Sequence, residues 1–275
     1  MSVSPVTTRQ LERYVSLIER ALSRTLSPVK GSPPHLEEAM RYCVIGGGKR
    51  FRPLLCVGAS EAVGGSPRQA LSAACAIELI HTYSLVHDDL PAMDNADERR
   101  GRASCHRKFG QAMAILVGDA LLTRAFELLS RNGVPNAMQI MRAIGEASGT
   151  AGLVGGQVLD LQCGMGNVEC GMKQLEETAR RKTGALITAS VVAGGLAGRA
   201  SSTALTRLRQ FGQRLGLAFQ LRDDVHDGDG LVKAVGRNAV ERRVQTLIDQ
   251  AQQTIAPLGQ RAWALRELAD WLATN

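Results

Sequence analysis

Hydrophobic positions along the chain recur at helical spacing. Between residues 8 and 26 the apolar side chains are three or four residues apart: Leu11, Val15, Ile18 and Leu22. This spacing places them on one face of a helix. The same reasoning predicts further helices over 36–45, 54–63, 69–90, 110–131, 137–163, 173–198, 203–228 and 238–273. Short Gly, Pro or Ser breaks separate these ranges, and none shows the period of two that is typical of a strand.

The helices are predicted to form one all-α domain. No linker, convincing repeat or low-complexity segment divides residues 1–275, so one bundle of about ten helices is the economical interpretation. Apolar residues make up 44% of the chain, which is enough for one sizeable core, whereas aromatic residues make up only 4%. Because aromatic residues are scarce, packed helices are favoured over a β-sandwich.

Charge and composition narrow the classes of function. The net charge of +7 is spread along the chain without a Lys/Arg-rich tract, which argues against nucleic acid and suits a polyanionic small substrate. No apolar run is long enough for a membrane span, and the first residues do not resemble a signal peptide. The six cysteines form no C-x-x-C pair, so we expect reduced thiols in a cytoplasmic protein.

Two clusters of aspartates carry the strongest chemical signal. The first runs from His87 to Asp94 and the second from Gln220 to Asp227, and each follows an apolar helical stretch. In the second cluster Asp223 and Asp227 are four residues apart, where two carboxylates repel each other unless a cation lies between them. A few carboxylates with room for water suit magnesium that also binds phosphate oxygens. A solvated acidic helix end is the alternative for either cluster alone.

Basic residues lie close to glycines and to the first aspartate cluster. Residues 47–53 read GGKRFRP, which combines a glycine turn with three cations, and residues 97–102 read DERRGR. Arginine forks bind phosphate oxygens bidentately, and lysine adds a point charge. The glycine turn lacks the spacing of a P-loop. Each basic segment alone is typical of a solvated face, so it is the neighbouring glycines and aspartates that favour diphosphate binding.

The motifs of one known family are found in order between residues 40 and 227. They are GGGKRFRPLL, IELIHTYSLVHDDLPAMDNADERRG, AILVGDALL, GLVGGQVLDL, ARRKTGALI and LAFQLRDDVHD. Together they resemble the trans-prenyl diphosphate synthase family, most closely its bacterial farnesyl diphosphate synthases. The resemblance implies an isoprenoid-synthase-type bundle of mostly antiparallel helices around a deep central cavity, usually assembled as a homodimer.

The resemblance also assigns roles to single residues. It implies that three magnesium ions are held by two sets of carboxylates: Asp88, Asp89 and Asp94, and Asp223, Asp224 and Asp227. Isopentenyl diphosphate is expected at the glycine turn and its surroundings: Gly48, Lys49, Arg52, His81 and Arg100. The allylic diphosphate is expected at Arg99 and Lys182. The implied groups beside the reacting carbons are Thr183 and Gln220, with Gln157 and Asp160 along a polar wall.

The implied reaction condenses isopentenyl diphosphate with dimethylallyl and geranyl diphosphate to give (2E,6E)-farnesyl diphosphate and diphosphate. Tyr83 lies five residues before Asp88 on the predicted helix and is expected to stop the growing tail, with the small Ser84 leaving room above it. The alternatives are a geranyl or geranylgeranyl diphosphate synthase, and a weakly active partner subunit that binds prenyl diphosphates. A terpene cyclase is disfavoured because the isopentenyl-binding set is present. His87, His106 and His226 are interpreted as structural.

The chain departs from the family after Asp227. The family continues there through a long loop with a further lysine that closes over the allylic diphosphate, whereas this chain reads GDGLVKAVGR and enters a helix. About twenty residues are absent by comparison with ordinary loop lengths. Either a mobile loop is absent from this sequence, or the enzyme closes its site in another way, or its turnover is weak.

Overall fold

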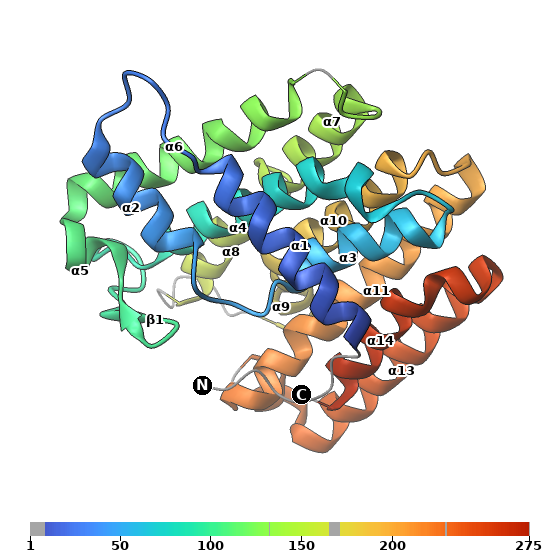
Figure 1. Cartoon of the computed structure of the whole chain (residues 1–275). Helices are drawn as coiled ribbons and strands as arrows, with labels where there is room; N and C mark the ends of the chain where they lie inside the picture. The colour runs from blue at the N-terminus through green and yellow to red at the C-terminus, as the bar shows by residue number, and fades with distance from the viewer. Residues whose placement is uncertain (1–8, 132, 165–170, 229, 275) are drawn as a thin grey trace. The chain divides into compact units, whose positions relative to one another are not determined.

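The computed structural model describes residues 9–131, 133–164, 171–228 and 230–274 (Figure 1). Its elements in chain order are α1 (Arg9–Thr25), α2 (Pro34–Val44), α3 (Phe51–Ala62), η1 (Pro67–Ala70), α4 (Leu71–Asp88), β1 (Glu98–Arg99), β2 (Arg102–Ala103), α5 (Cys105–Phe109), α6 (Gln111–Leu129), α7 (Ala137–Ser148), α8 (Leu153–Gly164), α9 (Met172–Ala179), η2 (Arg180–Gly184), α10 (Ala185–Ala197), α11 (Ser202–Asp227), α12 (Leu231–Val235), α13 (Arg237–Ile255), η3 (Ala256–Ala262) and α14 (Trp263–Thr274). The all-α prediction is confirmed. Within the described ranges no helix is both long and apolar enough to cross a membrane.

The chain divides into two compact units. The first takes the described parts of Met1–Leu54 and Leu71–Val134, and the second those of Leu55–Ala70 and Pro135–Asn275. The boundary therefore falls inside α3, and the single domain expected over the whole chain stays a prediction.

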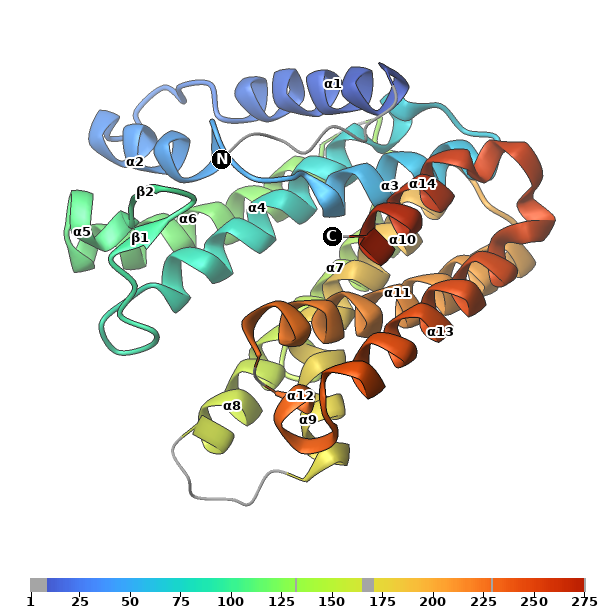
Figure 2. The same ribbon diagram turned by 90° about the horizontal axis from the view of Figure 1, so that it is seen from below.

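Helix α4 is the core of the first unit. It packs against α1, α2 and α6, and Figure 2 shows it alongside α6. Between Ala73 and Val86 nearly every side chain of α4 is buried, so the helix is apolar on all faces rather than along one stripe. Among the buried side chains of α4, Glu78 is the acidic one, at 2% exposure, and it forms an ion pair with Arg50.

Helices α10 and α11 form the core of the second unit, with α7 against α10 and α13 beside α11 (Figure 2). Glycines let the backbones approach closely in two places. A Cβ on Gly216 of α11 would lie 2.7 Å from the Cα of Gly184, and one on Gly194 of α10 would lie 1.9 Å from the carbonyl oxygen of Cys56. A larger residue at either place would force the helices apart.

The predicted helices are right in kind but not always in extent. The range 137–163 is two helices, because the chain turns between Ser148 and Leu153 through two glycines. The range 238–273 is interrupted at η3, where Gly259 adopts a φ of 67°. The prediction that no strand exists is wrong at β1 and β2, a two-residue hairpin too short to show a period of two.

Candidate active site

The first aspartate cluster follows the C-terminal end of α4. The backbone N–H of Asp94 donates to the carbonyl oxygen of Asp88 at 2.8 Å, so the chain returns to the helix end and brings these two residues together. Asp94 is exposed and Asp88 is half-buried. Asp89 is only 2% exposed and accepts hydrogen bonds from Arg99. Its carboxylate is therefore engaged by Arg99.

The β1–β2 hairpin presents two of the predicted cations. Arg100 and Gly101 form its turn with φ values of 57° and 71°, the left-handed pair that a tight two-residue hairpin requires. Arg99 donates through Nε to Asp89 at 3.0 Å, and this hydrogen bond raises the pKa of the guanidinium. The hairpin thus holds Arg99 beside the aspartate cluster, and the next residue, Arg100, turns to the glycine loop.

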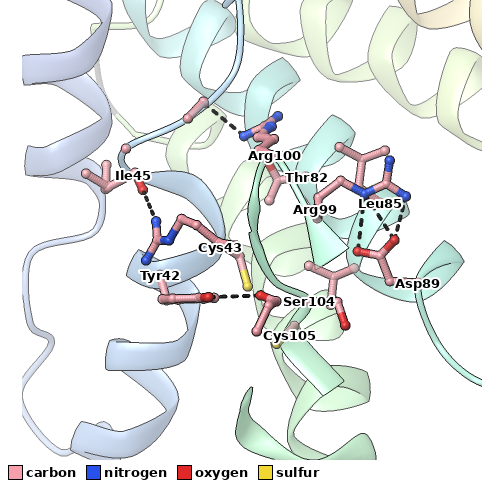
Figure 3. Close-up of a pocket in the computed structure, with 15 residues that line it drawn as sticks. Tyr42, Cys43, Ile45, Thr82, Leu85, Asp89, Arg99, Arg100, Ser104 and Cys105 are labelled. Carbon is pink, nitrogen blue, oxygen red and sulfur yellow. Dashed lines mark hydrogen bonds and ion pairs between the residues drawn. The ribbon is translucent and has the colours of Figure 1, made fainter. Parts of the chain in front are cut away.

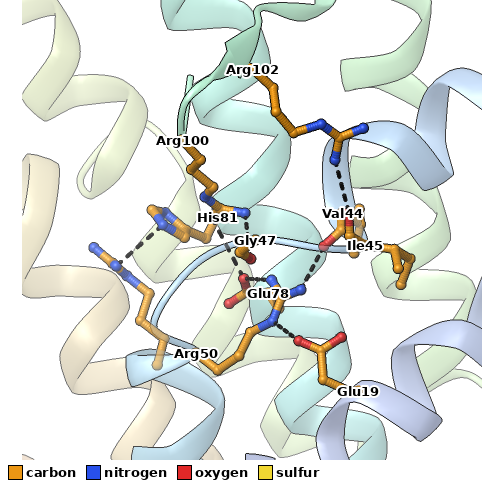
Figure 4. A network of polar contacts seen from close by, with 10 residues as sticks. Glu19, Val44, Ile45, Gly47, Arg50, Glu78, His81, Arg100 and Arg102 are labelled. Atoms are coloured by element: carbon orange, nitrogen blue, oxygen red, sulfur yellow. Dashed lines mark hydrogen bonds and ion pairs between the residues drawn. The ribbon is translucent and has the colours of Figure 1, made fainter. Parts of the chain in front are cut away.

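The glycine loop at residues 46–48 lies under Arg100. The guanidinium donates to the carbonyl oxygen of Gly47 at 2.9 Å, as Figure 4 shows. A Cβ on Gly48 would lie 2.8 Å from Cζ of Arg100, and the φ of Gly48 is +95°. Only glycine meets both demands, so the structure gives a physical reason for the glycine at this predicted position.

Arg50 is a structural cation, because two carboxylates of the protein bind its buried side chain (Figure 4). Its side chain is 1% exposed and donates to Glu19 and to Glu78, each at 2.6 Å. Arg50 is therefore a structural member of the three cations in this segment, and it was not among the residues expected to bind diphosphate. Sequence reasoning missed the role because Glu19 and Glu78 lie on distant helices, and no local signal pairs them with the arginine.

Arg52 and His81 lie together, whereas Lys49 is exposed on the loop. A guanidinium nitrogen of Arg52 is 3.4 Å from Nε2 of His81. Burial lowers the pKa of His81 well below its usual value, and the charge of Arg52 lowers it further. The imidazole is therefore neutral, so its ring nitrogen can accept a hydrogen bond from a cation or donate one to a phosphate oxygen.

Two thiols meet in a small cavity of the first unit (Figure 3). The cavity has a volume of about 40 Å³, and its lining includes Cys43, Cys105, Asp89 and Arg99. The thiol of Cys43 is hydrogen-bonded to that of Cys105, which raises the pKa of Cys43 and lowers that of Cys105.

The cysteines depart from the prediction at one position. Cys43, Cys56, Cys75 and Cys105 are free thiols, but Cys163 at the end of α8 is disulfide-bonded. The expectation of reduced thiols throughout is wrong at Cys163, and Cys170 lies outside the described residues.

The predicted chain-length residues are buried within α4. Tyr83 is 7% exposed, and its ring makes an edge contact with His87 at 5.9 Å between centroids. Ser84 is also 7% exposed, and its hydroxyl donates to the carbonyl oxygen of His81. His87 packs against α6, where a Cβ on Gly118 would lie 2.0 Å from the ring, so this histidine has a structural contact.

The second aspartate cluster ends α11. Asp223 and Asp227 are exposed, one turn apart, while Asp224 is half-buried. Both oxygens of Asp224 are engaged: Oδ1 accepts from Nε2 of Gln220 and Oδ2 from the backbone N–H of Leu231, each at 3.1 Å. In each cluster, then, the second aspartate accepts hydrogen bonds within the protein, and the last aspartate is exposed.

A π-helical turn, η2, carries Lys182 and Thr183. It interrupts the helix predicted over 173–198, and such turns are frequent at functional sites. Nζ of Lys182 donates to Asp160 of α8, and Oγ1 of Thr183 donates to Oε1 of Gln220 on α11, each at 2.6 Å. The turn therefore connects α8 and α11, which joins four predicted site residues that are far apart in sequence.

Close packing holds this turn against α8. A Cβ on Gly156 would lie 2.2 Å from the backbone nitrogen of Lys182. Gln157, the next residue, is 9% exposed, and its amide nitrogen has no hydrogen-bond partner among the described residues. A buried, unsatisfied donor is costly, so it fits a polar wall that a bound group would complete.

The carboxylates fit a metal that phosphate would help to hold. No group of three or more His, Cys, Asp or Glu side chains that could hold a metal is found in the described ranges. Each cluster instead offers two solvent-accessible carboxylates: Asp88 and Asp94, and Asp223 and Asp227. Magnesium bound by one or two carboxylates keeps several waters and takes phosphate oxygens as further ligands. The donor set therefore suits a metal–diphosphate complex.

The connection after α11 is short. α11 ends at Asp227, α12 spans Leu231–Val235, and α13 begins at Arg237. The sequence-based expectation that the chain enters a helix directly is confirmed. Lys233 lies on α12, and His226 is exposed near the end of α11.

The helical fold and the paired aspartate clusters define the class of isoprenoid-synthase-type proteins. A profile of the polyprenyl synthetase family matches residues 33–244. The chain therefore belongs to the polyprenyl synthetase family.

Individual relatives carry different product names. The chain is 44% identical over 232 residues to a farnesyl diphosphate synthase of Geobacillus stearothermophilus, covering 82% of this chain and 77% of that protein. It is 45% identical over 230 residues to heterodimeric geranylgeranyl pyrophosphate synthase large subunit 1 of Arabidopsis thaliana. That match covers 81% of this chain but only 62% of the relative's length. The crystal structure of an FPP/GFPP synthase from Zymomonas mobilis matches with a TM-score of 0.91 at 37% identity, covering 96% of this chain and 97% of that one.

Proposed function

We propose that this protein is a magnesium-dependent prenyltransferase that joins isopentenyl diphosphate head to tail to dimethylallyl and geranyl diphosphate. One observation carries the proposal: each aspartate cluster keeps two accessible carboxylates, and its second aspartate is held by protein contacts. The prenyltransferase names of the relatives support the same activity.

The carboxylates would bind magnesium, and the cations would bind the two diphosphates directly. Asp88 and Asp94 in the first unit, and Asp223 and Asp227 in the second, would hold magnesium. Bound magnesium would supply Lewis-acid stabilisation of the negative charge that grows on the leaving diphosphate. Asp89 would act through Arg99, which it orients, rather than as a metal ligand.

The cations would bind the two substrates separately. Lys49, Arg52 and Arg100 would bind isopentenyl diphosphate, with the neutral His81 as a hydrogen-bonding neighbour and Gly48 leaving room for Arg100. Arg99 and Lys182 would bind the allylic diphosphate. Fixed cations of this kind cost no reorganisation as the leaving group becomes charged.

The reaction would proceed without a protein nucleophile. The allylic C–O bond breaks so that both electrons leave with diphosphate, and an allylic cation remains. The alkene of isopentenyl diphosphate attacks the cation to form the new C–C bond, and transfer of a proton from the resulting cation to the released diphosphate restores the alkene. Thr183 would direct the lone pairs of its hydroxyl oxygen at the positive charge while donating to Gln220, and apolar walls would exclude water that would quench the cation.

Farnesyl diphosphate is the proposed product because Tyr83 is a buried ring one and a half turns below Asp88. At 1.5 Å per residue this places Tyr83 about 7.5 Å deeper along α4. Geranylgeranyl diphosphate is the second candidate, since relatives with that product name match equally well.

Product analysis by mass spectrometry tests both the proposed activity and the proposed chain length. The purified chain, magnesium, isopentenyl diphosphate and either allylic starter should give the fifteen-carbon product, and absence of magnesium-dependent turnover would contradict the proposed activity. Tyr83→Ala should lengthen the main product. Tyr14→Ala, which truncates an equally buried tyrosine on α1 at 7% exposure, should not change product length. If Tyr83→Ala still makes the same product at full rate, Tyr83 is not the residue that stops the growing prenyl tail.

A homodimer is the proposed assembly. Ile115 and Leu116 expose 46% and 54% of their surface on adjacent positions of α6, an apolar pair that a second copy could cover. The alternative is a weakly active partner subunit, which turnover by the isolated chain would exclude.

A further inference from the structure

A chain of three hydrogen bonds runs through the second unit to Thr183. The backbone N–H of Leu231 donates to Oδ2 of Asp224 at 3.1 Å. Nε2 of Gln220 donates to Oδ1 of the same carboxylate at 3.1 Å. Oγ1 of Thr183 donates to Oε1 of Gln220 at 2.6 Å. The short segment after α11 is thereby connected to the π-helical turn through two side chains.

The carboxylate fixes the direction of every donor in this chain. An ionised aspartate only accepts hydrogen bonds, so the amide of Gln220 must turn its NH2 group to Asp224 and its oxygen to Thr183. Thr183 then has to donate its single proton to Gln220. The lone pairs of the Thr183 oxygen remain available to face a positive charge.

The connection after α11 fixes Asp224 in turn. Gly230 has a φ of +56°, and a Cβ there would lie 2.4 Å from Oδ2 of Asp224. The backbone can thus approach the carboxylate closely enough for Leu231 to donate to it. Asp224 is half-buried, whereas Asp223 and Asp227 are exposed.

We propose that Asp224 is a positioning residue that sets the hydrogen-bond direction of Gln220 and Thr183, and that it is not a direct metal ligand. This inference rests on the proposed prenyl transfer, because it assigns to Thr183 an acceptor oxygen aimed at the allylic cation. It also means that the short connection between α11 and α12 contributes to catalysis by holding Asp224 in place.

Two single variants separate positioning from metal binding. Asp224→Asn keeps shape but adds a donor, so the amide of Gln220 can turn over. We expect kcat to fall about 10- to 100-fold, the range seen for residues that orient an active group. The KM values for both substrates should be unchanged. Calorimetric titration of magnesium with inorganic pyrophosphate should give wild-type affinity for Asp224→Asn and weaker affinity for Asp223→Asn.

A double variant tests the direction of the hydrogen bonds. In Gln220→Glu/Asp224→Asn the carboxylate and amide exchange places, so the total charge is unchanged and Thr183 again faces a pure acceptor. We expect its kcat to recover at least several-fold over Asp224→Asn, whereas Gln220→Glu alone places two carboxylates together and should stay impaired.

Three outcomes would overturn the inference in distinguishable ways. A double variant no faster than Asp224→Asn would contradict the role of hydrogen-bond direction. Loss of magnesium affinity in Asp224→Asn equal to that in Asp223→Asn would make Asp224 a ligand. A wild-type chain without turnover would overturn the proposed function itself, and this inference with it.

Discussion

At the scale of single residues, neighbouring cations of one motif have opposite roles. Arg50 is buried between Glu19 and Glu78, while Arg52 two residues later contacts His81. The sequence alone makes them equivalent, and only their partners distinguish them.

Replacing these two arginines should therefore affect different measurements. Arg50→Ala leaves Glu78 buried without its main partner, which should cost about 3–5 kcal/mol in the free energy of unfolding. Arg52→Ala should change stability little and mainly raise the KM for isopentenyl diphosphate. Urea unfolding and steady-state kinetics on both variants check this. Equal stability losses would contradict the distinction.

His81 should contribute a measurable dependence of stability on pH. Its pKa in the folded protein lies below the unfolded value of 6.5, so the unfolded chain binds more protons in acid. The unfolding free energy should then fall as pH drops below about 6.5. His81→Asn should show a shallower decline between about pH 7 and 5 than wild type. Identical slopes for wild type and His81→Asn would count against a buried neutral His81.

At the scale of elements, the π-helical turn η2 is positioned by glycines of the helices beside it. Gly156 of α8 lets that helix lie against the backbone of Lys182, and Gly216 of α11 approaches Gly184. The side chains of Lys182 and Thr183 then reach Asp160 and Gln220.

A methyl group at Gly156 should displace the turn. Its Cβ would lie 2.2 Å from the backbone nitrogen of Lys182, so Gly156→Ala should destabilise the protein by about 1–3 kcal/mol. A misplacement of about 1 Å can lower kcat on the order of a hundredfold. Gly184→Ala is the matched control, because its Cβ would meet nothing closer than 3.5 Å. Thermal unfolding and kcat should change less in this control, and a larger effect there would refute the packing argument.

At the scale of the whole molecule, the proposed homodimer would cover apolar surface that the described chain leaves exposed. Ile115 and Leu116 are adjacent on α6, whereas Met138 on α7 is 73% exposed. Single exposed apolar residues are common on monomers, so the adjacent pair is the more informative feature.

A charge on α6 should disrupt the proposed homodimer. Leu116→Glu should shift the sedimentation profile toward monomer, because an unpaired carboxylate would be buried at the interface. Met138→Glu should leave the profile unchanged. A wild-type chain that sediments as a monomer would refute the proposed assembly.

The sequence by itself determined the helical class, most helix positions and the chemical types of the site. Periodicity of three and four residues reports one buried face directly, and the aspartate, arginine and glycine motifs name the chemistry without coordinates. The sequence did not determine every helix end, because a break such as Gly149–Gly152 or a π-helical turn depends on packing rather than on local propensity.

Only the tertiary structure decided which members of each motif face solvent and which are used by the protein itself. Asp89 is held by Arg99 of the hairpin that follows it, and Asp224 by Gln220 and the backbone of Leu231. Arg50 is held by Glu19 and Glu78 of other helices. The physical reason is that a buried charge must find a partner, and for Arg50 that partner comes from a distant part of the chain.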